Sequence, residues 1–205
     1  SPPPRRAAAN SAICWGPTEM AAKVLLFLLD SLFAFLTYAL LARFALQWAR
    51  APFRNPVGQF VVAVTDWMVR PARRVIPSAW GLDLPSLLLA WGCQGAYLGF
   101  AYGLMGGGLG IGDIAAIAQL ALIGLGEAAC HLAFGILIVA VVISWINPYA
   151  PLAPVFGALA QPMLRPFQRL IPPIGGVDLS PIAPFLIIQV LLIVLSYARA
   201  AVLLP

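Results

Sequence analysis

The chain has little charge for its length. Only 9% of its 205 residues are Asp, Glu, Lys or Arg, whereas 62% are hydrophobic. A soluble domain carries roughly 25% charged residues, so this chain cannot cover itself with a polar surface. Its mean hydropathy of +0.94 indicates an integral membrane protein without an appended soluble catalytic domain.

Residues that build metal and haem sites are also scarce. The cysteines Cys14, Cys93 and Cys130 stand far apart with no CxxC spacing, and the single histidine is His131. His131 follows Glu127 by one helical turn, which favours an interfacial histidine paired with that carboxylate over a haem or metal ligand. No Ser-His-Asp, Cys-His, HExxH or paired-carboxylate pattern is present. We therefore expect no enzyme activity, no cofactor and no metal site.

Long apolar runs, in contrast, are plentiful. A helix needs about 20 apolar residues to cross a hydrocarbon core about 30 Å thick. Four segments qualify and are predicted as transmembrane helices: about Val24–Trp48, Leu84–Leu104, Ile114–Ile146 and Pro181–Leu204. Ser180 and Asp113 are predicted to cap the starts of the fourth and third of these helices. The predicted fold class is all-α, with four spans.

The second half of the chain repeats the first. Residues 68–77 return 95 positions later as 163–172 with most of their arginines and prolines in place, and the same offset carries Asp83 onto Asp178. The sequence therefore predicts two tandem two-span units, at 20–105 and 114–205, joined by a glycine-rich linker at 106–113. Residues 1–19 lack periodicity and are expected to be a disordered tail, with a native start at Met20 as a hypothesis.

Each predicted unit has a long connection between its two spans. We name residues 49–83 the first connector and residues 146–180 the second connector. Apolar residues at helical spacing occur in both: Phe60, Val64, Trp67 and Met68 in the first, and Val155, Leu159 and Met163 in the second. Each connector is predicted to hold a short amphipathic helix at the membrane surface, which ends at the pair Arg70-Pro71 or Arg165-Pro166.

Arginines concentrate in the connectors, with Arg43 at their edge. The positive-inside rule then places both connectors in the cytoplasm and both termini outside, so that the two units run parallel. These arginines and two repeated aspartates are the predicted lipid-binding or partner-binding residues: Arg70, Arg73, Arg74, Arg165, Arg169, Asp83 and Asp178.

Polar residues also recur inside the predicted spans. Asp30 and Glu127 each stand 18 residues before a tryptophan, near the outer interface, and Gln94 and Gln189 occupy equivalent places in the second span of each unit. Such groups point to an ion path or a partner site. Alternatively, the carboxylates touch interfacial water and the glutamines form hydrogen bonds between helices. Both interpretations stay open.

The second unit carries a dense motif from Ser144 to Gln189. It comprises Ser144-Trp145-Ile146-Asn147-Pro148, Gln161-Pro162, Arg165-Pro166-Phe167, Arg169, Ile171-Pro172-Pro173, Gly175-Gly176, Asp178, Ser180-Pro181 and Gln189. This pattern resembles the YggT/YlmG family of small membrane proteins. The first unit matches it more loosely, through Asn55-Pro56, Arg70-Pro71, Arg74, Ile76-Pro77, Gly81 and Asp83, with Ser78 in place of the second unit's Pro173.

The resemblance implies a multi-pass protein of the bacterial inner membrane with no established enzyme activity. Family members are linked to osmotic stress tolerance and cell division, and plastid relatives to haem attachment and nucleoid distribution. We expect a scaffold or assembly factor that binds lipids, and another membrane protein or a second copy, without binding nucleic acid directly. The alternatives are a small channel or transporter, which would depend on Asp30, Glu127 and the glutamines, and a haem-assembly role through His131.

Overall fold

The structure, a computed structural model, describes residues 17–51, 55–76, 82–104, 106, 110–169 and 180–203. Every regular element in these ranges is an α-helix. The helices are α1 Pro17–Trp48, α2 Pro56–Val75, α3 Leu84–Leu104, α4 Ile111–Ile146, α5 Ala153–Gln168 and α6 Ile182–Leu203. The all-helical prediction is confirmed.

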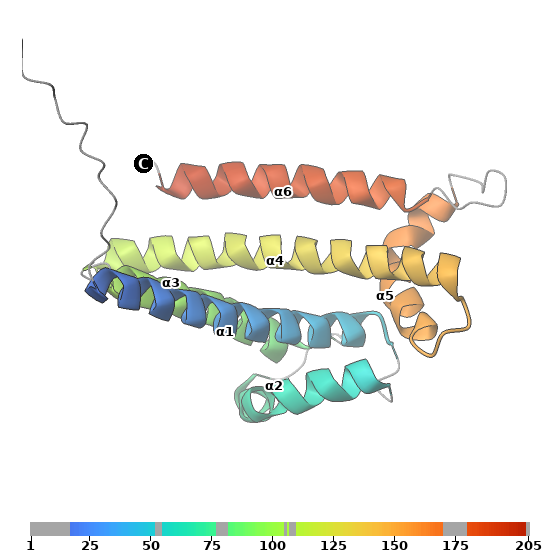
Figure 1. Ribbon diagram of the computed structural model, residues 1–205, viewed down its shortest axis with the longest axis horizontal. Coiled ribbons are helices and arrows are strands. Elements are labelled where there is room, and N and C mark those ends of the chain that lie inside the picture. The colour runs from blue at the N-terminus through green and yellow to red at the C-terminus, as the bar shows by residue number, and fades with distance from the viewer. Residues whose placement is uncertain are drawn as a thin grey trace, which may run out of the picture.

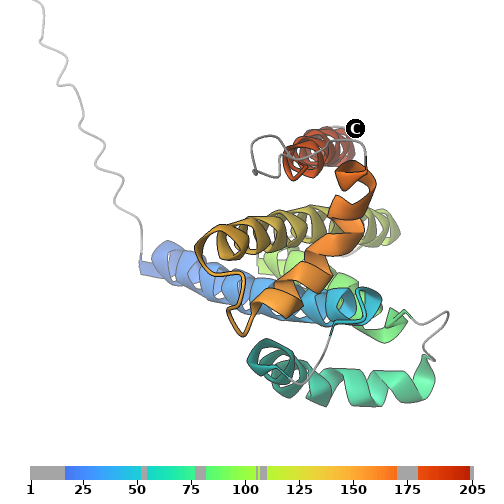
Figure 2. The same cartoon turned by 90° about the vertical axis from the view of Figure 1, so that its right-hand side faces the viewer.

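Four long helices lie side by side, and two shorter ones lie toward one end of them (Figure 1). α1 and α4 are parallel to each other, and α3 and α6 are antiparallel to both. The two units therefore have the same orientation. α2 packs along the outer side of α1, and α5 crosses the ends of α4 and α6, as Figure 2 shows face-on. Both connector helices are therefore at the same end of the bundle.

Three helices are long and apolar enough to cross a membrane. The qualifying stretches are Glu19–Trp48, Gly112–Ile146 and Ile182–Leu203, with mean hydropathies of 2.2, 2.4 and 2.2. α3 has the predicted bounds, yet it is not among the three found in the described residues. The sequence supplies a reason, because its 21 residues include four glycines, a glutamine and two tyrosines.

Helix starts differ from the predicted caps. α4 begins at Ile111, and Asp113 lies in its first turn, where its Oδ2 accepts a hydrogen bond from the backbone N–H of Gly110 at 2.9 Å. Gly110, not Asp113, is therefore the N-cap. The carboxylate nevertheless satisfies a backbone donor at the positive end of the helix, which is the role expected of an acidic residue there.

The prediction that the connector helices end at Arg-Pro is wrong. α2 continues through Pro71 to Val75, and α5 continues through Pro162 and Pro166 to Gln168. A proline inside a helix removes one hydrogen bond and costs about 3 kcal/mol. Packing offsets this cost, because each helix buries one face against the bundle.

α2 packs on the bundle through a face other than the apolar face that was predicted to meet the membrane surface. Val61, Thr65 and Val69 are buried, whereas Phe60 and Trp67 are 56% and 66% exposed. α5, in contrast, turns part of its predicted membrane face into the bundle, since Val155 and Leu159 are buried in the core.

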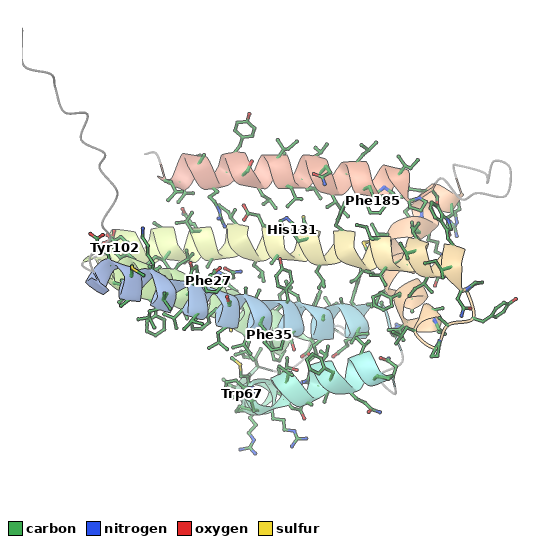
Figure 3. All side chains as sticks on the ribbon, viewed as in Figure 1. Phe27, Phe35, Trp67, Tyr102, His131 and Phe185 are labelled. Carbon is green, nitrogen blue, oxygen red and sulfur yellow. The ribbon has the colours of Figure 1, made fainter. Side chains whose placement is uncertain are left out.

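A single buried cluster joins five of the helices near the connector end. Its members include Leu46 of α1, Val61 of α2, Leu137 of α4, Leu159 of α5 and Ile188 of α6. Phe185, labelled in Figure 3, packs edge-on against Phe134 of α4, with ring centroids 4.9 Å apart. The connectors are thus integral to the bundle core and hold its polar groups in place.

Candidate functional site

Arg43, near the end of α1, is buried and bound by the first connector. Its Nη1 lies 2.9 Å from Thr65 Oγ1 and 2.9 Å from Asp66 Oδ1, both on α2. Its Nε lies 3.5 Å from Asp83 Oδ2, just before α3. The planar guanidinium carries five N–H groups and can bridge two carboxylates. Arg43 therefore ties α1 to α2 and to the start of α3.

Asp83 is the fully buried centre of this network. Its Oδ2 accepts hydrogen bonds from Arg73 Nη2 at 2.9 Å and from Ser86 Oγ at 2.7 Å. Its Oδ1 has no hydrogen-bond partner within the described residues. A buried carboxylate is tolerated when it is paired and hydrogen-bonded. Asp83 is thus placed to hold arginines of its own unit, with no surface open to a lipid or partner.

Arg70 is bound in the same way, by Asp66 one helical turn earlier. The distance from Arg70 Nε to Asp66 Oδ2 is 2.8 Å, although the arginine side chain is 79% exposed. Burial alone would raise the pKa of Asp66, but the hydrogen bonds and charges of Arg43 and Arg70 outweigh it and hold this pKa below its ordinary value. Asp66 is therefore ionised at neutral pH and compensates the charge of Arg70.

Five residues of the first unit's network correspond to uncharged residues in the second unit, whereas its central Asp83 corresponds to another aspartate, Asp178. Alignment of Trp48 with Trp145 gives an offset of 97 in the first span, and the connectors align at 95. Arg43, Thr65, Asp66, Arg73 and Ser86 then correspond to Ala140, Ala160, Gln161, Gln168 and Pro181. All five of these second-unit residues line one pocket of about 490 Å³ between α4, α5 and the start of α6. Among the described residues, a pocket thus lies where the first unit has Arg43, Thr65 and Asp66.

Both apolar and hydrogen-bonding groups line this pocket, which we name the repeat pocket. Ser144 and Trp145 contribute a hydroxyl and an indole from α4, and Gln161 contributes an amide from α5. Gly157 also lines it, and a Cβ at that position would meet nothing within 4 Å. The lining includes no charged side chain among the described residues. Such a surface suits a neutral, hydrogen-bonding group.

Arg165 and Arg169 lie elsewhere on α5, together with Pro162 and Pro166, around a shallow hollow. Both arginines are exposed, and neither has an ion pair within the part of the chain that the structure describes. Arg74, the first-unit equivalent of Arg169, is exposed as well. Asp178, the remaining predicted site residue of the second connector, lies outside the described residues.

The predicted intramembrane polar residues lie in three separate places. Glu127 Oε2 lies 2.8 Å from Arg199 Nη2, an ion pair that joins α4 to α6. Gln94 of α3 reaches the same place, because its Oε1 and Arg199 Nη2 both lie 3.3 Å from where a Cβ of Gly124 would be. Asp30 interacts instead with Tyr97 across α1 and α3.

Gln189 departs from its repeat partner. It is exposed on α6, whereas Gln94 sits between α3 and α4. Glu127, with its charge compensated by Arg199, gives no support to a relay of free carboxylates through the bundle.

His131 does not pair with the side chain of Glu127, contrary to prediction. Its Nδ1 lies 2.8 Å from the backbone carbonyl oxygen of Glu127, and the carboxylate is occupied by Arg199. His131 lies on the middle of α4 in Figure 3. Among the described residues, no group of three or more His, Cys, Asp or Glu side chains could hold a metal ion.

The sequence interpretation missed Arg43, Asp66 and Arg199 as structural partners. Arg43 served only to set orientation, although it lies inside a predicted span. A charged side chain in such a span needs a partner, and that requirement could have identified it. Asp66 stands four residues before Arg70 on a predicted helix, the spacing of a helical ion pair.

Comparison with known proteins identifies the family to which the chain belongs. The family model described as CCB3/YggT matches the chain twice, at residues 22–103 and 119–198. An uncharacterised protein of Pseudomonas aeruginosa is 36% identical over 168 residues, which cover 81% of this chain and 85% of that protein. No solved structure matches the chain.

Two further relatives carry names that the sequence motif anticipated. The uncharacterised protein YggT of Escherichia coli K12 is 36% identical over 168 residues, 82% of this chain and 86% of YggT. YlmG homolog protein 2 of Arabidopsis chloroplasts is 46% identical over 56 residues, 26% of this chain and 22% of that protein. The double match also confirms the duplication. The chain is a tandem pair of units and belongs to the CCB3/YggT family.

Proposed function

We propose that the protein is a non-enzymatic scaffold or assembly factor of the bacterial inner membrane, and that the second connector binds its partners. One observation carries the proposal. The first unit fills the junction of its spans and connector with buried ion pairs, whereas the second unit leaves a pocket of about 490 Å³ at the same junction. Among the described residues, the first connector thus pairs with its own spans, whereas the second leaves aromatic and hydrogen-bonding side chains facing a pocket.

The proposed topology has four spans, with α3 as the fourth. α3 has 21 residues, runs antiparallel to α1 and packs mainly on it. A helix of that length covers about 30 Å, the thickness of the hydrocarbon core. Both connectors would then face the cytoplasm, as their arginines favour, and the repeat pocket would open where cytoplasmic segments of other membrane proteins are within reach.

The lining of the repeat pocket suits a protein partner. Exposed aromatic residues such as Trp145, 70% exposed, are enriched among the residues that contribute most to binding. The amide of Gln161 and the hydroxyl of Ser144 can hydrogen-bond to a backbone segment. Because no charge needs compensation among the described lining residues, a neutral segment can enter without an ionic partner.

Gly157→Leu tests this proposal. The leucine side chain would enter the repeat pocket, since nothing lies within 4 Å of a Cβ there. The matched control is Gly135→Leu on α4, where a Cβ also meets nothing within 4 Å. Each substitution replaces a glycine inside a helix by leucine. Because leucine favours the helix over glycine by roughly 1 kcal/mol, both variants should fold.

The readouts are complementation of a deletion strain and mass spectrometry of the membrane proteins that co-purify in mild detergent. We expect Gly157→Leu to lose complementation and partner co-purification and Gly135→Leu to keep them. Neither variant should melt at a lower temperature than the parent protein. A Gly157→Leu protein that keeps its full set of stoichiometric partners would refute the proposal.

A further inference from the structure

An apolar groove runs between α4 and α6, beginning at α5. Small residues of α4 (Ala129, Cys130 and Ala133) form its floor, and Ile187 and Leu191 of α6 form one wall. Its volume is about 470 Å³. The groove extends away from the connector end along both helices, because Leu191 lies two turns further along α6 than Pro184, which also lines it.

The mouth of this groove is positively charged. Pro162 and Pro166 line the groove and also line the hollow that contains Arg165 and Arg169. The two cavities are therefore adjacent at α5, which crosses the bundle end in Figure 2. A cationic mouth that leads into an apolar groove matches a molecule with an anionic head and a hydrocarbon chain.

Comparison of the repeats explains why this charge is available. Arg70, the first-unit equivalent of Arg165, is paired with Asp66 at 2.8 Å. The residue one turn before Arg165 is Gln161, so the second unit lacks the carboxylate at this position. A single Asp-to-Gln difference between the repeats thus leaves Arg165 without the internal counterion that Arg70 has. An external anion can take that place.

We propose that this site binds an anionic phospholipid, with its phosphate between Arg165 and Arg169 and one acyl chain in the groove between α4 and α6. The inference rests on the proposed function in that it assigns a ligand to the second connector. A groove this apolar has no groups that bind a free phosphate or a nucleotide. An acyl chain, in contrast, can make more van der Waals contacts in a groove than among other lipid chains.

The test uses the full chain in nanodiscs, with spin-labelled phosphatidylglycerol as the probe and spin-labelled phosphatidylcholine as the neutral reference. We expect a preference for phosphatidylglycerol in the parent protein. Arg165→Gln should lower that preference about fivefold, the effect of one basic residue near a lipid surface. Gln161→Asp should lower it similarly, because it restores the counterion of the first unit while Arg165 remains.

Arg70→Gln is the matched control, since it removes the repeat-equivalent arginine whose charge is already compensated. We expect it to change the preference by less than twofold. Equal loss in Arg70→Gln and Arg165→Gln would show that net charge alone attracts the lipid, and would overturn the site. So would a parent protein that binds both lipids equally.

A second arm tests the acyl chain. Ala129→Phe would place a ring in the groove and should weaken binding of the labelled lipid while leaving both arginines in place. Excess glycerol phosphate should not displace the lipid from the parent. Displacement would show that only the head group is bound.

These measurements contain no partner protein, so they are independent of the Gly157→Leu experiment. Lipid selectivity together with an unaffected Gly157→Leu variant would retain the lipid site and reject the partner role of the repeat pocket.

Discussion

A guanidinium as buried as that of Arg43, 7% exposed, requires partners for its charge and its N–H groups. Asp66, Thr65 and Asp83 supply them, from an α2 helix and a loop that are distant in sequence. Without this arginine, the fully buried Asp83 would keep only Arg73 and Ser86 as partners, so Arg43 is expected to be a sensitive position in the first unit.

We expect Arg43→Ala to destabilise the protein by about 3–5 kcal/mol, the usual effect of breaking a buried ion pair. Arg74→Ala is the control, because Arg74 is exposed, and it should change stability by less than about 0.5 kcal/mol. Thermal unfolding in detergent, followed by circular dichroism, measures both. Equal melting temperatures for the two variants would contradict the network.

An ion pair also joins α6 to α4. α6 packs on α4 along one side, with most of its large apolar side chains exposed, and the Glu127–Arg199 pair is its polar link to α4. Gly124 makes room for that link by lacking a side chain where Arg199 and Gln94 meet.

A charge exchange tests the link. Glu127→Arg and Arg199→Glu should each increase hydrogen exchange across residues 182–203, because like charges would then face each other. The double variant should recover most of the protection, with a coupling on the order of 1 kcal/mol. If the loss of protection in the double variant equals the sum of the losses in the two single variants, the two residues do not act as a pair.

Helix existence could be predicted from the sequence, because apolar runs of spanning length and a 95-residue repeat are strong signals. The bounds of α3 were predicted correctly. The path of the chain through Pro71, Pro162 and Pro166 could not be predicted, since packing of α2 and α5 on the bundle decides it. Nor could spacing alone show that Thr65, and not Trp67, faces the bundle.

The candidate site was only partly predictable. Arg165 and Arg169 were identified from the repeat, but whether an arginine is paired depends on a residue from another helix or turn. The replacement of Arg43 by Ala140 is visible in the aligned repeats, yet the resulting pocket becomes apparent only when α4, α5 and α6 are packed together.

At the scale of the whole molecule, the direction of the helices places both connectors at one end of the bundle (Figure 1). The number of spans then determines their sides. With four spans, the connectors lie on the same side of the membrane. With α3 outside the membrane, they would lie on opposite sides.

Single cysteines at Arg74 and Arg169, in a background with Cys14, Cys93 and Cys130 replaced by serine, distinguish these topologies. We expect a membrane-impermeant maleimide to label both positions from the cytoplasmic side only. Gly112→Cys, between the units, should be labelled from the opposite side. Labelling of Arg74→Cys and Arg169→Cys from different sides would exclude the four-span arrangement.

The position of Arg43 also has a consequence for how the protein is made. Asp66 follows Arg43 by 23 residues, so the first helix emerges from the ribosome before the counterions of its cation have emerged. The first unit can close only after Asp83 and Ser86 have emerged. The second unit, with Ala140 at the same place, has no such wait. The polar core of the first unit should therefore form only after the start of α3 has emerged, and it should be absent from chains truncated before Asp83.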